Sequence, residues 1–183
     1  SNVTGTLSFN GPVDVSSGSF YTPSTYTNFS SSVNFAAGTI FNTPNSGVVN
    51  FNGSGPTAES LIFNNNPSFY NLSLVKTHSS GKNLSGFITV RNDLVVQSPL
   101  TNSSTATLIA KGHVYLNGTT YASSLGSTTL LINGASNQTL TVYDPQNSFG
   151  TLQVTKSSGN FLITANVPLN INRDFIYDPA TSP

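Results

Sequence analysis

FYNLSLVKT at residues 69–77 returns as FGTLQVTKS at residues 149–157, and this pair of segments decides the fold. Each segment begins with a phenylalanine, alternates apolar and polar residues, and ends on a lysine followed by threonine or serine. Alternation with a period of two indicates a half-buried β-strand. Because a serine-glycine turn follows each copy, at 79–81 and 157–159, both segments predict a strand that ends at a turn.

Two further landmarks recur around these segments in the same order. FNG at 51–53 returns as ING at 132–134, and ITVRNDLV at 88–95 returns as LNINRDFI at 169–176. The spacing of the matched segments is nearly constant, at about 80 residues, and a fixed period is typical of solenoids, in which each repeat packs against its neighbours. In a parallel β-helix, a unit of about 80 residues supplies roughly four coils of about 20 residues each.

The remaining sequence also reads as short strands. Strand patterns return about every 8–12 residues between Gly, Pro, Asn and Ser clusters, few stretches sustain a helical period, and no convincing helix is found. We therefore predict an all-β protein, a parallel β-helix (β-solenoid) built from repeats of about 80 residues, with a β-sandwich or jelly roll as the alternative. The predicted units are residues 1–47 (N-terminal strand, linker and cap), 48–129 (first repeat) and 130–183 (second, truncated repeat). Residues 12–32 are rich in Ser, Thr, Tyr and Pro and are expected to be a linker or a strand-poor cap.

The composition is that of an uncharged protein rather than a disordered one. Charged residues make up 7% of the 183 residues, apolar residues 36%, and the net charge is zero. Disordered chains usually combine low hydrophobicity with high net charge. Near-zero net charge removes the repulsion that keeps copies of a protein apart, so we expect self-association into a homopolymer. A surface of Ser, Thr and Asn favours an extracellular or cell-surface protein.

Several classes of site and partner are disfavoured by the same composition. The six Lys and Arg residues are scattered singly, so no nucleic acid partner is expected. The absence of cysteine rules out disulfides and thiolate metal sites. No apolar run approaches the roughly 18 residues of a membrane span. The sequence opens without an initiator methionine or a signal sequence, as expected of a mature or trimmed product.

The order of the motifs resembles the repeats of large secreted microbial surface proteins of the β-solenoid adhesin kind. The resemblance covers about residues 49–177 and is carried by the apolar-Asn-Gly turn, the Phe-x-x-Leu-x-(Leu/Val)-x-Lys-(Ser/Thr) strand and the (Asn/Arg)-Asp-(Leu/Phe) turn. Those repeats typically have a glycine before the aspartate, where this chain has Asn92 in one copy and Arg173 in the other. The resemblance implies an extracellular scaffold or adhesin, and it brings no catalytic residue and no cofactor.

The acidic residues do not suggest a catalytic pair. They are Asp14, Glu59, Asp93, Asp144, Asp174 and Asp178. Asp93 and Asp174 occupy equivalent repeat positions and are expected to cap equivalent turns. Asp144 and Asp178 sit in Tyr-Asp-Pro turns, where aspartate commonly binds backbone amides. Glu59 and Asp14 are isolated in sequence. Glycoside hydrolysis needs two carboxylates about 5–10 Å apart, so a solenoid polysaccharide-degrading enzyme stays an open alternative that requires acids to gather in space.

The basic residues and histidines also lack partners in the sequence. His78 lies in a Ser/Gly turn and is expected to be solvated, and His113 begins a strand; neither has the spacing of a metal ligand. Lys76 and Lys156 are repeat equivalents and are expected to project from a face of the solenoid. We therefore predict no enzyme activity, no cofactor and no metal site.

The N-terminal strand has two interpretations. Val3, Gly5, Leu7 and Phe9 alternate with polar residues, as one face of a strand does. This strand is either the first strand of the chain's own sheet or a donor strand that completes the sheet of a neighbouring subunit. A donor strand would also cover an exposed sheet edge.

The function predicted from these patterns is an extracellular structural protein, a subunit of a filament, surface layer or adhesin that assembles by β-strand pairing between subunits. The alternative is a carbohydrate-binding or tail-fibre-like recognition domain, whose partners would be glycans or a cell surface. Its candidate contacts are Tyr21, Tyr26, Tyr70, Tyr115 and Tyr121. A secreted protein with this much Asn, Ser and Thr also carries N-glycosylation sequons, of which those at Asn52 and Asn117 lie in predicted turns and are the most accessible.

Overall fold

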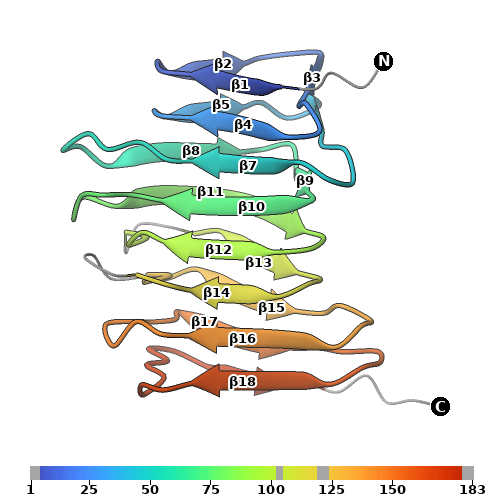
Figure 1. The fold of residues 1–183 in the computed structure, drawn as a ribbon, viewed down its shortest axis with the longest axis vertical. Helices are drawn as coiled ribbons and strands as arrows, with labels where there is room; N and C mark the ends of the chain where they lie inside the picture. The colour runs from blue at the N-terminus through green and yellow to red at the C-terminus, as the bar shows by residue number, and fades with distance from the viewer. Residues whose placement is uncertain (1–4, 102–104, 119–123, 179–183) are drawn as a thin grey trace.

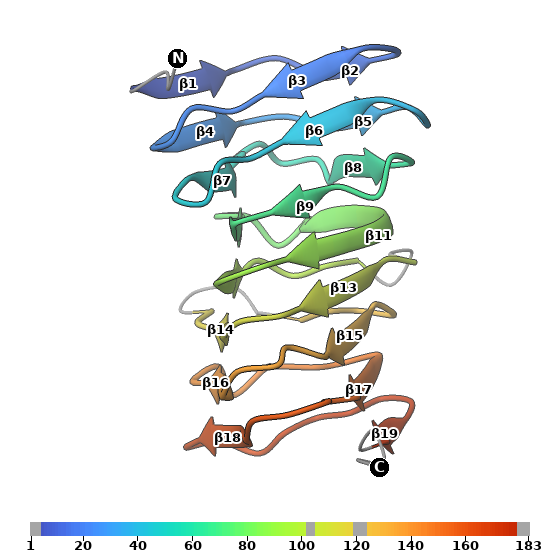
Figure 2. The same cartoon turned by 90° about the vertical axis from the view of Figure 1, so that its right-hand side faces the viewer.

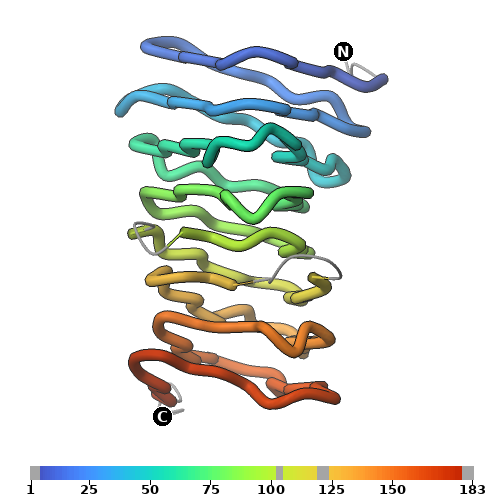
Figure 3. The backbone as a smooth tube through the Cα atoms, turned by 90° about the vertical axis from the view of Figure 1, so that its left-hand side faces the viewer, coloured from blue at the N-terminus to red at the C-terminus, as the bar shows by residue number. Residues whose placement is uncertain are grey.

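The chain folds as a stack of β-strand coils, one above the next (Figure 1). The computed structural model describes residues 5–101, 105–118 and 124–178. Within these residues all the strand pairs are parallel, as in a β-helix, and there is no helix. The prediction of an all-β parallel β-helix is confirmed, in place of the sandwich alternative. The first and last strands lie at opposite ends of the stack (Figures 1 and 3).

Face 1 of the stack is a sheet of eight strands. In spatial order, which is also chain order, they are β1 (Thr6–Phe9), β4 (Tyr26–Phe29), β7 (Val48–Phe51), β10 (Asn71–Val75), β12 (Leu94–Gln97), β14 (Val114–Leu116), β16 (Gln138–Val142) and β18 (Phe161–Ala165). Register partners come from successive coils, since Thr6 pairs with Tyr26 and Val114 with Leu140. The first coil therefore has the predicted length, and some later coils are longer because their corners are longer.

The other two sides of the stack share β11 (Lys82–Val90). Face 2 consists of β2 (Val13–Val15), β5 (Val33–Phe35), β8 (Glu59–Phe63) and residues 82–86 of β11. Face 3 consists of β3 (Ser19–Tyr21), β6 (Ile40–Asn42), β9 (Ser68–Phe69), residues 87–90 of β11, β13 (Thr107–Ala110), β15 (Thr129–Ile132), β17 (Thr151–Val154) and β19 (Phe175–Tyr177) (Figure 2). In the coils after β11, face 2 is formed by isolated β-bridges in place of full strands among the described residues, such as the bridge between Phe149 and Ile171.

A glycine allows β11 to turn from face 2 to face 3. Gly86 has a φ of +101°, and a Cβ atom there would lie 2.0 Å from the carbonyl oxygen of Phe63. Before this glycine the strand pairs with β8, and after it with β9 and β13. The backbone conformation and the lack of space both require glycine at this corner.

The interior of the first coils is filled by stacked phenylalanine rings. Because partners in a parallel sheet lie directly beside one another, Phe9, Phe29 and Phe51 form a row on face 1 with successive ring centroids 5.1 Å apart. Phe35 and Phe63 stack in the same way on face 2, with centroids 5.9 Å apart. Further along the stack Leu, Val and Ile take these positions, and the buried residues form one continuous cluster. Such rows add aromatic contacts to the burial of apolar area.

Polar side chains form similar rows on the outside. The amide Nδ2 of Asn50 donates to Oδ1 of Asn28 at 2.9 Å, and Nδ2 of Asn28 donates to Oγ of Ser8 at 3.3 Å. On face 3, Thr107, Thr129 and Thr151 are register partners in three successive strands. Hydrogen bonding between identical amides satisfies polar groups without charges, which agrees with a composition poor in charged residues.

The sequence repeat differs from the structural coil. The matched segments fold on different faces, with Leu72 in β10 on face 1 and Leu152 in β17 on face 3. On face 1, three coils lead from Leu72 to Leu140 and the fourth leads to Ile163, so the spacing of the sequence repeat falls between three and four coils. What repeats is a strand with its turn, used once on each of two faces.

The N-terminal region is part of the stack. The expectation of a linker or strand-poor cap at residues 12–32 is wrong, because this region contains β2, β3 and β4. Its strands are three or four residues long, and the Ser, Thr and Pro residues between them form the corners. Strand pairing also runs across the predicted boundaries at 47/48 and 129/130, since β4 pairs with β7 and β15 begins at Thr129. The predicted boundaries at 47/48 and 129/130 therefore describe units of the sequence repeat, and their division of the chain stays a prediction.

Candidate functional site

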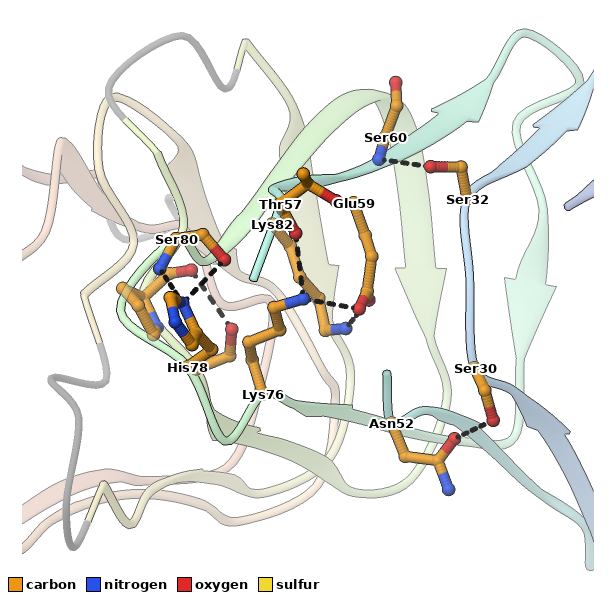
Figure 4. A network of polar contacts seen from close by, with 12 residues as sticks. Ser30, Ser32, Asn52, Thr57, Glu59, Ser60, Lys76, His78, Ser80 and Lys82 are labelled. Carbon is orange, nitrogen blue, oxygen red and sulfur yellow. Dashed lines mark hydrogen bonds and ion pairs between the residues drawn. The ribbon is translucent and has the colours of Figure 1, made fainter. Parts of the chain in front are cut away.

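Three charged side chains meet inside the corner between faces 1 and 2. Glu59 begins β8, Lys76 directly follows β10 and Lys82 begins β11 (Figure 4). The ammonium of Lys76 donates to Oε1 of Glu59 at 2.6 Å and to the carbonyl oxygen of Thr57 at 3.0 Å. The ammonium of Lys82 donates to the other carboxylate oxygen, Oε2. Counted over the whole residue, the exposed fractions of Glu59, Lys76 and Lys82 are 6%, 2% and 0%, so the cluster is shielded from water.

The charges in this cluster do not balance. One carboxylate faces two lysines, and burial lowers the pKa of Lys82, against the opposing effect of Glu59, while the charge of Lys76 lowers it further. Desolvation favours the neutral amine and the carboxylate favours the ammonium. The desolvation effect is the larger of the two, so Lys82 gives up its proton more readily than an exposed lysine.

A second corner, between faces 3 and 1, repeats this arrangement with a neutral acceptor. Lys156 lies two residues after the end of β17 and donates to Oε1 of Gln138 at 2.8 Å, and to the carbonyl oxygens of Gly134 at 2.6 Å and Ser136 at 2.8 Å. The amide nitrogen of Gln138 donates to the carbonyl oxygens of Ala110 at 3.0 Å and Gly112 at 2.8 Å. Burial lowers the pKa of Lys156 as well.

A glycine makes room for the buried acceptor in each corner. A Cβ atom on Gly53 would lie 1.8 Å from Oε1 of Glu59, and one on Gly134 would lie 2.8 Å from Oε1 of Gln138. These glycines belong to the repeated FNG and ING turns, and the lysines to the repeated strand. The recurring motif is therefore a lysine of one coil that binds a Glu or Gln seated over a glycine in the preceding coil.

Two sequence-based expectations are corrected by these corners. Lys76 and Lys156 do not project from a face of the solenoid, because their ammonium groups point into the corner and bind the preceding coil. Glu59 is isolated in sequence but is held between two lysines in space. Sequence spacing missed the contact because Glu59 and Lys76 are neighbours across coils. The recurrence of the lysine, as Lys76 and as Lys156, was the one feature of the sequence that could have indicated a shared structural role.

The ends of the stack are open sheet edges. Within the described residues, β1 pairs only with β4 and β18 only with β16, while β19 pairs only with β17. Phe175 is the register partner of buried Leu152 yet is 55% exposed, and Tyr177 is the partner of buried Val154 yet is 65% exposed. Inward-facing positions of the last coil are thus apolar and uncovered by the described residues.

A pocket of about 420 Å³ lies at this end of the stack. It is lined by Val154, Lys156, Ser157, Ser158, Gly159, Asn160, Phe161 and Tyr177. The lining joins the corner that holds Lys156 to the last strand, so the pocket is a consequence of the open end.

The N-terminal strand belongs to the chain's own sheet. Of the four candidate donor residues, Val3 lies outside the described residues and Gly5 lies just before β1. Phe9 stacks on Phe29, and Leu7 is 37% exposed in the same strand. One edge of β1 is occupied by β4, and no other described strand pairs with its opposite edge.

The candidate tyrosines do not form one platform. Tyr21 and Tyr26 flank the corner between β3 and β4 and are 69% and 50% exposed. Tyr70 is half-buried with the guanidinium carbon of Arg91 5.7 Å from its ring centroid. Tyr115 lies on β14, four strands from β4 and therefore about 19 Å away. Tyr121 lies outside the described residues.

The other candidates occupy turns and strand ends. Asn52 is exposed and its Oδ1 accepts a hydrogen bond from Ser30, whereas Asn117 is half-buried and its sequon ends at Thr119, outside the described residues. As predicted for a turn, Oδ1 of Asp144 accepts the backbone amide of Gln146 at 2.8 Å. His113 accepts the backbone amide of Thr139 at Nδ1.

Comparison with known protein families, with curated proteins and with solved structures finds no match to this chain. In the part of the chain that the structure describes, no three His, Asp or Glu side chains gather as they would around a metal ion. Across residues 5–101, 105–118 and 124–178, there is no helix with the length and apolar character of a membrane span.

Proposed function

We propose that this chain is an extracellular structural protein, a subunit of a filament, surface layer or adhesin that assembles by strand pairing between copies. The observation that carries the proposal is the stack of parallel coils itself, in which each strand pairs with strands of the neighbouring coils. Within the described residues the stack exposes apolar side chains such as Phe175 and Tyr177, and exposed apolar surface marks an interaction site.

The rest of the molecule supports a structural role. Buried Lys76 and half-buried Lys156 each tie one coil to the coil before it, through Glu59 and through Gln138. The outer row of asparagines satisfies polar groups without charges, and the net charge of the chain is zero. Without electrostatic repulsion, copies of the chain approach one another readily. A long and uniform stack is suited to carrying load or spacing rather than to enclosing a substrate.

Electron microscopy and sedimentation of the secreted chain test the proposal. Ordered filaments or sheets that appear above a threshold concentration, together with antibody labelling of intact producing cells, are the expected results. Dispersed single particles at high concentration, or labelling only after the cells are opened, would contradict it.

One observation favours a second candidate, a glycan-recognition domain. Tyr21 and Tyr26 expose their rings on either side of one corner, and aromatic rings are common contacts for sugars. Binding on a glycan array that is lost in Tyr26→Ala, and kept in a variant of the distant Tyr115, would support this alternative.

A further inference from the structure

The side chains of Lys156 and Gln138 meet in the corner between faces 3 and 1. The ammonium nitrogen of Lys156 lies 2.8 Å from Oε1 of Gln138. Since a carbonyl bond is about 1.2 Å long, this nitrogen is at most about 4 Å from Cδ of the glutamine. We propose that the two side chains join through an isopeptide bond between Nζ of Lys156 and Cδ of Gln138, which links one coil covalently to the coil before it. The bond forms within one chain, so it is independent of assembly between copies.

The side-chain amide of Gln138 is held at both its oxygen and its nitrogen. Oε1 accepts the backbone N–H of Gly134 at 2.7 Å, and Nε2 donates to the carbonyl oxygens of Ala110 at 3.0 Å and Gly112 at 2.8 Å. Because only 2% of Gln138 is exposed, these bonds fix the amide in one orientation. Negative charge develops on Oε1 when a nucleophile adds to Cδ, and a backbone N–H already aimed at that oxygen stabilises the charge.

Lys156 is positioned as the nucleophile. Its Nζ donates to Oε1 of Gln138 and to the carbonyl oxygens of Gly134 and Ser136, and these three contacts keep the nitrogen beside Cδ. A shift of about 1 Å brings Nζ to the separation of about 3–3.5 Å from which attack occurs, and holding the reactants together in this way replaces a collision in solution. Burial lowers the pKa of Lys156, so the amine form that carries the lone pair is more populated than in an exposed lysine.

The reaction balances without a further reactant. The ammonium of Lys156 releases a proton to water, and the lone pair of Nζ then forms the bond to Cδ of Gln138 while the π electrons of the carbonyl move to Oε1. A proton passes from Nζ to Nε2, the carbonyl forms again and the bond between Cδ and Nε2 breaks. Nε2 leaves as ammonia, which takes up the released proton as ammonium. One amide replaces another, so nothing is oxidised or reduced.

The corner of Glu59, Lys76 and Lys82 supplies an internal comparison. Its acceptor is a carboxylate, and each of the two carboxylate oxygens binds one lysine. The negative charge of a carboxylate opposes the addition of a nucleophile to its carbon, and Glu59 has no ammonia to release. We therefore expect this corner to remain an ion pair. The amide of Gln138 is the chemical difference that makes the other corner reactive.

Mass spectrometry of the full chain tests for the bond. The intact mass is expected to be lower than the mass of the sequence by one ammonia. Trypsin cleaves after unmodified lysine and arginine, so digestion of the denatured chain is expected to leave Lys156 uncut and to give one peptide of residues 112–173, also lighter by one ammonia. Succinimide formation at an Asn-Gly pair such as 133–134 removes the same mass, but it leaves the chain cleavable after Lys156.

Two variants serve as matched controls. Gln138→Glu keeps an acceptor for Lys156 and reproduces the carboxylate of the other corner, whereas Lys156→Arg keeps the positive charge and removes the primary amine. Trypsin is expected to cut at position 156 in both variants, without the loss of ammonia. Resistance at this position in Gln138→Glu would show a different cause. A parent chain with the full mass of the sequence, or one that is cut completely after Lys156, would overturn the isopeptide bond and leave the proposed structural function untouched.

Discussion

The ammonium of Lys76 lies 2.6 Å from the carboxylate of Glu59, and the exposed fractions of the two side chains are 0% and 7%. The second carboxylate oxygen is bound by Lys82. A buried ion pair gains little over apolar packing, but removal of one partner leaves the remaining charge without compensation. Glu59 is therefore the residue on which two buried ammonium groups depend.

Glu59→Gln is expected to lower the free energy of unfolding by about 3–5 kcal/mol, because it removes the charged carboxylate that both buried lysines bind. Urea unfolding followed by circular dichroism measures the change. The triple variant Glu59→Gln, Lys76→Met and Lys82→Met is the control, and it should recover much of the loss since the buried charges are gone. If Glu59→Gln alone is as stable as the parent protein, the corner does not hold the coils together.

We expect the titration of Lys82 to change the free energy of unfolding with pH in the alkaline range. Burial lowers its pKa in the folded chain below the ordinary value of 10.5. Between the two pKa values the unfolded chain binds more protons than the folded chain, so the free energy of unfolding rises as pH increases toward 10.5. We expect this rise to be weaker in Lys82→Met. The measurement is a series of urea melts across the alkaline range.

The titration of Tyr115 changes the free energy of unfolding with pH in the opposite direction, so it needs its own control. Burial, with a smaller contribution from Asp93, raises the pKa of its phenol above 10.0. The unfolded chain then loses this proton first, so stability falls as pH rises through 10.0. The chain with Lys82 and the Lys82→Met variant are therefore compared in a Tyr115→Phe background. If the free energy of unfolding changes with pH equally in both, Lys82 is not the source of the rise.

Gly86→Ala is expected to destabilise the fold by more than about 1 kcal/mol, since a side chain at positive φ is strained and its Cβ would strike the backbone of Phe63. Gly55→Ala is the matched control, because nothing lies within 4 Å of its Cβ position and its φ is not positive. Thermal or urea unfolding distinguishes the two variants. Equal effects would show that the bend in β11 tolerates a side chain.

The phenylalanine rows offer a test of the core. Phe51 is fully buried between Phe29 and the next coil, and Phe51→Ala is expected to cost about 3–5 kcal/mol of unfolding free energy. Phe87, which is 59% exposed on the outside of the bend, is the control, and Phe87→Ala should change stability by less than about 0.5 kcal/mol. A large effect at Phe87 would show that its ring is covered by another molecule.

Local patterns predicted most of the strands beyond residue 32 and favoured the parallel β-helix, but they missed β2, β3 and β4 in the N-terminal region. Alternation in segments such as 71–75 reports which side of a strand faces inward, and this property belongs to the strand itself. The face on which each strand lies depends on corner lengths, which vary from coil to coil, as the register pairs Thr6–Tyr26 and Val114–Leu140 show. The match of Leu72 with Leu152 in the sequence repeat therefore hid the fact that the two lie on different faces.

The buried corners were not predicted, because a lysine after a strand is usually exposed. Lys76 and Lys156 bind acceptors that lie 17 and 18 residues earlier in the chain. Only the register of neighbouring coils brings these partners together. The glycine, the acceptor and the lysine each recur in the sequence, but their contact in space follows from the stacking.

The last coil allows a test of assembly that leaves the fold intact. Phe175→Ser is expected to reduce filament or sheet formation, because Phe175 supplies exposed apolar surface at a core position of the end coil. Leu152, its register partner, is fully buried, so Leu152→Ser should instead unfold the chain. Sedimentation measures assembly, and circular dichroism measures folding, in the same samples. If Phe175→Ser assembles at the same concentration as the parent chain, the end coil is not the contact surface, since loss of an exposed phenyl ring from an interface weakens association.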